Sequence, residues 1–274
     1  MIELLPEQVE ALRQLKRACA EAGVDAVVIG ATAYRVWIDD DRRTQDVDVA
    51  IALDIDQIQS LTDRLQSAKW THDPRREERW LTQAGARIDL LPIGEQARRT
   101  GYVTWPKAEM RMSVAGFEHL FDEAVEKELA PETVMKVAPL HVLALLKIVA
   151  YMDDPHGRSK DLEDLGRLME RYELEGDRRF SNEVFEAGLD FESSGAFLLG
   201  LDVGRLCSGT ESDIVGNLIA ATQDDRQYER LLARRRLDEH DVGESQKRTE
   251  AFAAGFVIGR RESNGRKAKN ARSL

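Results

Sequence analysis

The chain has 274 residues, 42% of them hydrophobic and 32% charged, with a formal net charge of −11. This composition is that of a soluble, somewhat helix-rich globular protein with one domain of moderate size or two small ones. No apolar run approaches the roughly 20 residues that span a bilayer, the N-terminus carries no export signal, and the negative charge weakly opposes a broad nucleic-acid footprint.

The two cysteines, Cys19 and Cys207, lie far apart and have no His or Cys beside them at metal-ligand spacing. This argues against a disulfide framework and a zinc site, so we expect two reduced thiols. From the lack of an export signal we expect a cytoplasmic protein. Basic residues gather in the first hundred positions, at Arg42, Arg43, Arg75, Arg76, Arg79, Arg98 and Arg99, and in the last fifteen. Two interpretations account for these basic residues: solvated loops with a solubilising tail, or local phosphate binding.

The first part of the chain predicts helices alternating with strands. Pro6, the apolar spacing after it and Gly23 predict a helix of about 17 residues. VDAVVIG predicts a buried strand ending at Gly30, ATAYRVWI a helix and DVDVAIAL a second strand. Asp54 is the expected N-cap of the helix IDQIQSLTDRLQSA. RWLTQ and ARIDLLPI then predict two strands joined around Gly85.

The pattern turns helical in the second part. Residues 116–129 predict an amphipathic helix, ETVMKV a short strand, and PLHVLALLKIVAYM and SKDLEDLGRLMERY two further helices. The fold class is therefore α+β, with a small mixed sheet followed by a helical C-terminal half. We expect an α+β domain over 1–138, a helical domain over 139–258 and a basic, disordered tail over 259–274.

Two aspartates, Asp46 and Asp48, interrupt the apolar strand after the first helix–turn unit. Side chains alternate along a strand, so both lie on one face, with Cα atoms roughly 6.5 to 7 Å apart. Asp89 has the same apolar flanks, and if its strand is a neighbour its Cα lies roughly 5 Å away. Three such carboxylates repel one another unless a cation lies among them, and Mg²⁺ or Mn²⁺ suits oxygen ligands.

Simpler interpretations stay open at this point. Asp46 is able to cap a turn or pair with Arg43, and an Asp-x-Asp is common in loops. Gly30, Ala31 and Thr32 follow a buried strand and open a helix, which offers free backbone N–H groups and a hydroxyl to a phosphate, although a Gly after a strand is more often just a turn.

Lys147 is the one formally charged residue between Lys136 and Asp153. Its amine either extends out of the apolar helix to solvent or grips a triphosphate as a point charge. Asp161 and Asp164 follow, three apart on one helical face, where capping and surface pairing are the simplest roles.

Together, G-A-T-A, R-T-Q-D-V-D, R-I-D-L-L, the lysine on an apolar helix and R-S-K-D-L-E-D-L resemble the polymerase-β-type nucleotidyltransferases, and within them the AbiEii-like toxins of type IV toxin–antitoxin or abortive-infection systems. The resemblance covers residues 24–172, with looser similarity in GLDFESSGAFLLGLDVG. Ala31 departs from the family's first motif, which is usually Gly-Gly-Thr or Gly-Ser.

The resemblance implies a two-metal transfer of an NMP from an NTP to an acceptor, either RNA such as a tRNA 3′ end or a protein. Asp46, Asp48 and Asp89 then bind Mg²⁺ or Mn²⁺, and Asp89 accepts the proton of the attacking hydroxyl. Lys147 contacts the phosphates together with Gly30, Ala31 and Thr32, and Asp161 matches the fourth motif. A cognate antitoxin is an expected partner. The alternatives are an enzyme that modifies a small molecule such as an antibiotic, or an inactive nucleotide-binding relative.

Overall fold

The computed structural model describes residues 4–38, 44–223 and 239–271. Arg43, the possible partner of Asp46 in the sequence, lies outside these ranges, as does Arg42. The chain forms two units that divide between Leu143 and Ala144. Each unit is described separately below.

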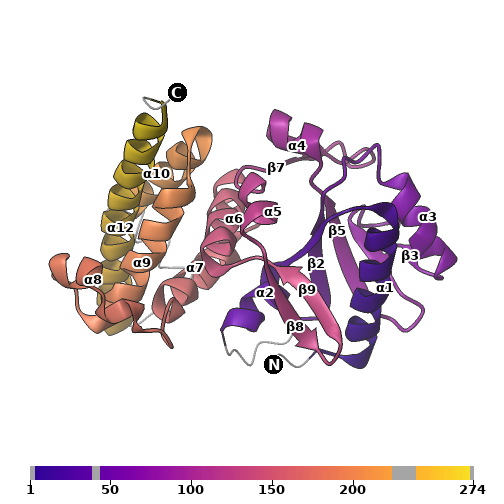
Figure 1. The fold of residues 1–274 in the computed structure, drawn as a ribbon, viewed down its shortest axis with the longest axis horizontal. Helices are drawn as coiled ribbons and strands as arrows, with labels where there is room; N and C mark the ends of the chain where they lie inside the picture. The colour runs from indigo at the N-terminus through magenta and orange to yellow at the C-terminus, as the bar shows by residue number, and fades with distance from the viewer. Residues whose placement is uncertain (1–3, 39–43, 224–238, 272–274) are drawn as a thin grey trace. The chain divides into compact units, whose positions relative to one another are not determined.

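Seven strands form one mixed sheet in the first unit (Figure 1). In chain order they are β1 (Ala26–Ile29), β2 (Asp46–Ile51), β3 (Thr71–His72), β4 (Arg79–Leu81), β5 (Arg87–Pro92), β8 (Val125–Ala130) and β9 (Thr133–Val137). The spatial order is β3-β4-β5-β2-β1-β9-β8. β2 therefore lies at the centre, parallel to β5 and antiparallel to β1. The two strands expected around Gly85 form the antiparallel hairpin β4–β5.

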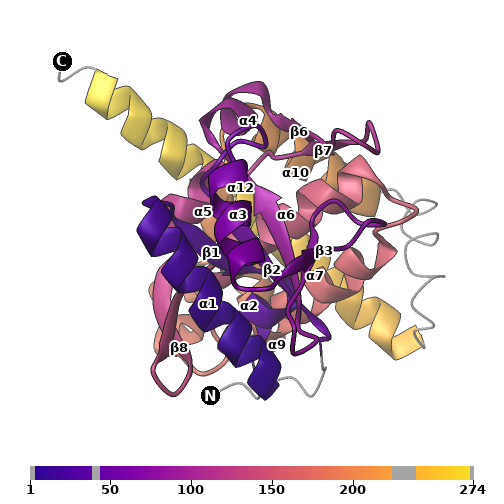
Figure 2. The ribbon, with the colours of Figure 1, turned by 90° about the vertical axis from the view of Figure 1, so that its right-hand side faces the viewer.

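The first unit also has five helices and a small hairpin among its described residues. They are α1 (Pro6–Ala22), α2 (Gly30–Trp37), α3 (Gln59–Ser67), α4 (Glu95–Thr100), α5 (Glu118–Glu123) and the pair β6 (Tyr102–Thr104) and β7 (Arg111–Ser113). The α1 helix has the predicted 17 residues. It lies beside α3 on one side of the sheet, with α2 on the other (Figures 1 and 2).

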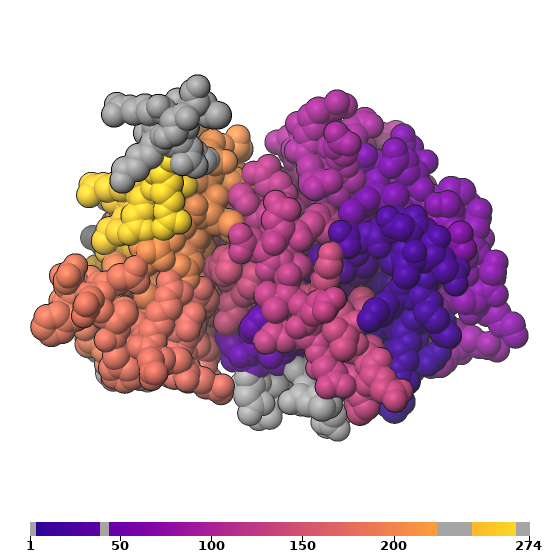
Figure 3. Space-filling view, viewed as in Figure 1, coloured from indigo at the N-terminus to yellow at the C-terminus, as the bar shows by residue number. Residues whose placement is uncertain are grey.

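The hairpin β8–β9 lies next to α1 on the surface of the first unit (Figure 3). Arg13 Nε donates to Oγ1 of Thr133 at 2.8 Å, and Lys16 Nζ donates to the carbonyl oxygen of Val134 at 2.7 Å. These bonds fix the first helix to the edge of the sheet.

Two local predictions in this unit are wrong. The helix predicted over residues 116–129 ends at Glu123, and the next residues form β8, an edge strand whose backbone pairs with β9. Asp54 does not cap α3, which begins at Gln59. Its carboxylate instead accepts from the backbone N–H groups of Gln96 and Ala97, both at 2.9 Å, and so caps α4.

Helices make up the second unit among the described residues. α6 (Leu140–Asp153) starts before the division, and it is followed by α7 (Ser159–Arg171), the 3₁₀ turn η1 (Asp177–Phe180), α8 (Asn182–Glu186), α9 (Phe191–Leu206), α10 (Gly209–Gln223) and α12 (Glu239–Ala271). α6 and α7 match the two helices predicted there. Among the described helices, none has the length and apolar character needed to cross a bilayer.

α9 and α12 pack with their backbones in direct contact. Gly200 and Gly204 on α9 face Gly255 and Gly259 on α12, and a Cβ added at any of these glycines would overlap a backbone carbonyl of the other helix. This packing, with the buried Phe252 beside it, anchors the C-terminal helix. The expected disordered tail is therefore wrong for residues 259–271, which continue α12, while residues 272–274 lie outside the described ranges.

Candidate functional site

Asp46 and Asp48 lie on the same face of β2, as the alternation of the strand predicts. Val47 and Val49 between and after them have no exposed surface, whereas both aspartates are partly exposed. The hydroxyl of Thr44 donates to Oδ1 of Asp46 at 3.1 Å and to its backbone oxygen at 2.9 Å. The strand therefore buries its valines and presents two carboxylates to one side.

The third predicted carboxylate joins them through strand register. β2 and β5 pair in parallel with Asp48 directly opposite Asp89. On its other side β2 pairs with β1, where Ile29 is opposite Asp48. The expected neighbourhood of Asp48 and Asp89 is confirmed, and it follows from main-chain pairing rather than from a loop.

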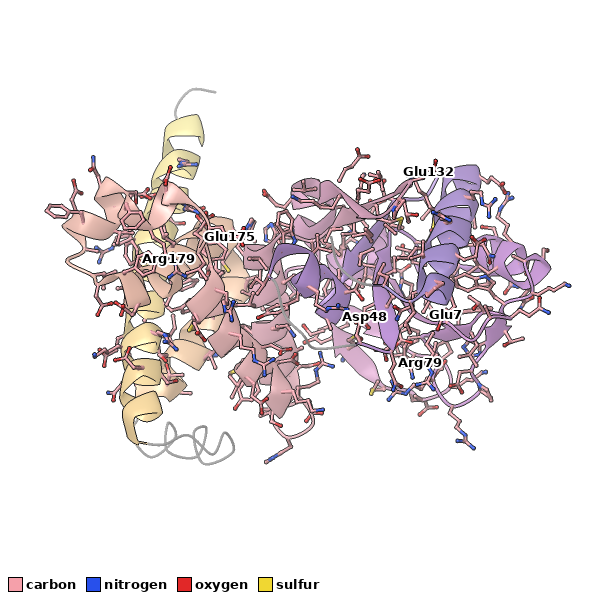
Figure 4. All side chains as sticks on the ribbon, turned by 90° about the horizontal axis from the view of Figure 1, so that it is seen from below. Glu7, Asp48, Arg79, Glu132, Glu175 and Arg179 are labelled. Atoms are coloured by element: carbon pink, nitrogen blue, oxygen red, sulfur yellow. The ribbon has the colours of Figure 1, made fainter. Side chains whose placement is uncertain are left out.

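Arg79 supplies a positive charge inside this cluster (Figure 4). Its Nε donates to Oδ1 of Asp89 at 2.7 Å and its Nη2 to Oδ2 of Asp89 at 2.8 Å. The same Nη2 also donates to Oδ2 of Asp46 at 2.5 Å. These contacts raise the pKa of Arg79 above its ordinary value, with the hydrogen bond to Asp89 as the largest cause. The guanidinium thus stays charged and bridges two of the three carboxylates.

Gly30 brings the start of α2 against Asp48. Its φ is +65°, in the left-handed region, and a Cβ there would overlap the Asp48 carboxylate. The backbone N–H groups of the first turn of α2 thereby lie next to the cluster. Thr32 has no exposed surface, and its Oγ1 has no hydrogen-bond partner among the described residues. Because the Thr32 side chain is buried, its hydroxyl does not face solvent where a phosphate would bind. The phosphate-binding role of Thr32 stays a prediction.

Lys147 belongs to a separate charged group in the second unit. Its side chain is 12% exposed, and its Nζ lies 3.1 Å from Oδ1 of Asp161 and 2.6 Å from Oδ2 of Asp164. Nε of Arg158 lies 2.7 Å from Oδ2 of Asp161. Both aspartates are buried, so they are not surface pairs, and the amine does not extend to solvent. Lys147 instead faces two carboxylates of α7.

The residue that the sequence analysis left out of the site is Arg79. It was counted among the basic residues of the first hundred positions but not as a partner of the carboxylates. A signal was present, because the β4–β5 hairpin pairs Trp80 with Ile88 and Leu81 with Arg87, and the same register places Arg79 opposite Asp89. Arg79 is the first residue of the predicted strand RWLTQ, so pairing that strand with ARIDLLPI around Gly85 would have placed Arg79 near Asp89.

The comparisons with known proteins agree with a nucleotidyltransferase. The sequence profile described as "Nucleotidyl transferase AbiEii toxin, Type IV TA system" matches residues 13–263. No curated protein sequence matches the chain.

Several solved structures are similar at low identity. A nucleotidyltransferase-like protein from Paracoccidioides brasiliensis is 13% identical with a TM-score of 0.45, over 84% of this chain and 94% of that one. JHP933 from Helicobacter pylori is 17% identical with a TM-score of 0.34, over 99% and 100% of the two chains. A CCA-adding enzyme solved with ATP is 12% identical with a TM-score of 0.35, over 97% and 84%.

Proposed function

The chain belongs to the AbiEii family of nucleotidyltransferase toxins, and from this premise we propose that it moves an NMP from an NTP to a macromolecular acceptor with the help of a divalent cation. The observation that carries the proposal is the placement of Asp46 and Asp48 side by side on one face of β2. In the reaction an acceptor oxygen bonds to the α-phosphorus, the bond from that phosphorus to the bridging oxygen of the β-phosphate breaks, and pyrophosphate leaves. The hydroxyl proton is assigned to water and not, as the resemblance implies, to Asp89, because both Asp89 oxygens already accept from Arg79.

The carboxylates differ in how well they suit a cation. Asp46 and Asp48 are partly exposed and lie on one face of one strand, and their carboxylates supply the oxygen ligands that Mg²⁺ and Mn²⁺ prefer. Asp89 was expected as a third ligand, but its side chain is 8% exposed and both of its oxygens accept from Arg79. We therefore assign the cation to Asp46 and Asp48. When bound, it neutralises charge on the phosphate oxygens and on the leaving group.

Phosphate binding is assigned to backbone N–H groups and to the amine of one lysine. The first turn of α2, at Gly30 and Ala31, offers backbone N–H groups beside Asp48. Lys147 is assigned to the nucleotide phosphates, with Asp161 as the residue that holds its amine. We assign the nucleotidyltransferase domain to residues 1–138 and a helical domain to residues 139–258. The division of the chain into two units after Leu143 supports a boundary near residue 138.

The acceptor is proposed to be RNA, such as a tRNA 3′ end, or a protein. The family description, a toxin of a type IV toxin–antitoxin system, supports a macromolecule of the cell and a cognate antitoxin as partners. Both NTP and these acceptors are cytoplasmic, so we place the protein there. An antitoxin gene next to the gene of this chain would support the toxin assignment.

The experiment is a labelling reaction. The protein is incubated with Mg²⁺, each of the four labelled NTPs, and total RNA or cell lysate, and the products are separated into RNA, protein and small molecules. We expect label on RNA or protein, and none with Asp48→Ala, because a water in place of the carboxylate misplaces the cation. Asp56→Ala, on a carboxylate beyond the end of β2, is the matched control and should label as the parent does.

Other results would point to the alternatives. Label on a small molecule alone would identify the antibiotic-modifying type of enzyme. No label with any NTP, together with a nucleotide-dependent rise in melting temperature, would identify an inactive relative, for which Ala31 is the hint in the sequence.

A further inference from the structure

Arg79 is held in place by regular secondary structure. β4 and β5 pair antiparallel with Arg79 opposite Asp89, and β5 pairs with β2 so that Asp89 is opposite Asp48. The Arg79 side chain is 10% exposed and that of Asp89 is 8% exposed. A guanidinium that donates two parallel hydrogen bonds to one buried carboxylate forms a strong, geometrically specific pair. The position of this charge is therefore set by three adjacent strands.

The two partners of Arg79 are held differently. Asp89 is buried and gives both oxygens to the guanidinium, so that separating the pair would leave an uncompensated charge in the interior. The Asp46 side chain is 35% exposed and accepts from Arg79 through Oδ2 alone. A cation that binds Asp46 must therefore share this carboxylate with Arg79 or displace Nη2 from it.

We propose that Arg79 is the built-in cation of the carboxylate cluster and competes with the divalent ion for Asp46. Asp89 is then a positioning residue that holds Arg79, and not a ligand of the ion. The inference rests on the proposed function, since it requires that Asp46 and Asp48 bind a cation. It explains how three neighbouring carboxylates stay compatible with the folded strand in the absence of metal, because two of them already share a positive charge.

The test measures Mn²⁺ binding by calorimetry, without nucleotide, after treatment with EDTA. The main variant is the double replacement Arg79→Met with Asp89→Leu, which exchanges the buried pair for apolar side chains of similar volume and leaves no unpaired charge. The control is Arg87→Met, which removes a neighbouring positive charge that donates a hydrogen bond to Oε1 of Gln45 at 3.0 Å. Asp46→Asn defines the binding that belongs to the site. Melting curves in EDTA check that each variant is folded.

We expect the double variant to bind Mn²⁺ about tenfold more tightly than the parent, since a charge-assisted hydrogen bond no longer competes for Asp46. The control should change affinity by about twofold at most, because exposed charges are screened. A role of the Arg79–Asp89 pair in folding alone predicts no gain in affinity.

Besides an unchanged Mn²⁺ affinity of the double variant, two results would overturn the inference and leave the proposed function intact. One is weaker Mn²⁺ binding in the double variant, which would make Asp89 a ligand. The other is an equal gain in the Arg87→Met control, which would mean general electrostatics. If the parent itself shows no Mn²⁺ binding that Asp46→Asn removes, the cation site of the proposed function fails, and the inference fails with it.

Discussion

The carboxylate of Asp48 occupies the space into which a β-carbon at residue 30 would project. Gly30 follows the last residue of β1 and is the first residue of α2, with a φ of +65°, so two requirements meet at this residue. It must adopt the left-handed conformation, and it must leave room for the carboxylate.

Replacing Gly30 by alanine should therefore destabilise the protein and disturb the cation site. Gly23→Ala is the matched control, because Gly23 has a φ of +66° and no atom within 4 Å of an added Cβ. The control should lower the free energy of unfolding by about 1 to 2 kcal/mol, from backbone strain. Gly30→Ala should lower it by about 2 kcal/mol more and weaken Mn²⁺ binding, measured by urea unfolding and calorimetry. Equal losses in the two variants would show that Asp48 does not need the space.

Titration of Mg²⁺ or Mn²⁺ into metal-free protein should raise its melting temperature, because the cation binds the folded strand and not the unfolded chain. Asp46→Asn combined with Asp48→Asn should abolish the rise. Asp63→Asn, on the exposed face of α3, is the control and should keep it. An equal rise in parent and double variant would place the binding elsewhere on the chain.

Lys147→Met should destabilise the second unit, by about 3 to 5 kcal/mol, since it leaves two buried aspartates without their shared amine. Adding Asp164→Asn should restore most of this stability, because Asp161 keeps Arg158 at 2.7 Å.

The restored double variant separates the two roles of Lys147. We expect its transfer activity to stay roughly ten- to hundred-fold below the parent, the effect of losing one charge-assisted contact to phosphate. Activity at the parental rate, with parental stability, would make Lys147 a structural residue only.

The two thiols should resist modification in the folded protein. Burial raises the pKa of Cys19 and of Cys207 to about 12, from a value of 9.0 for a free thiol. Iodoacetamide at pH 8 should therefore label both residues in denaturant and neither in the native state.

The same shift has a consequence for stability. Because the folded pKa lies above the unfolded one, the contribution of the thiols is fully present below pH 9 and is lost as the pH rises from 9 to 12. The variant with both cysteines replaced by alanine should lose less stability over this interval. Rapid labelling of the native protein at pH 8 would contradict the burial of the thiols.

The carboxylate cluster was predictable because its neighbours obey simple periodicity. Val47 and Val49 alternate with Asp46 and Asp48, and Ile88 and Leu90 flank Asp89, so the sequence indicates both strands and the face that each carboxylate occupies. Their side-by-side placement required only that β2 and β5 be neighbours, and the structure pairs them in that register.

The errors lie where a distant segment decides the local structure. Residues 125–130 consist mostly of helix formers, yet they pair with β9 and form the edge strand β8. Charged side chains are common on edge strands. Aspartate is a preferred N-cap residue, so the sequence predicts that Asp54 caps the helix that follows it. Its carboxylate instead accepts hydrogen bonds from the backbone N–H groups of Gln96 and Ala97. The two positive charges at Arg79 and Lys147 had carboxylate partners that neither composition nor helical spacing revealed.

The close approach of α9 and α12 bears on the order of events during synthesis. Residues 1–143 are contiguous and include every strand of the seven-stranded sheet, so this unit has all its strand partners once its own segment has left the ribosome. α9 ends at Leu206, but the glycines that it packs against lie at residues 255 and 259. The face of α9 that packs on α12 therefore stays uncovered while α10 and the first part of α12 are being made. The carboxylate cluster is therefore complete on a nascent chain in which α9 has not yet packed against α12.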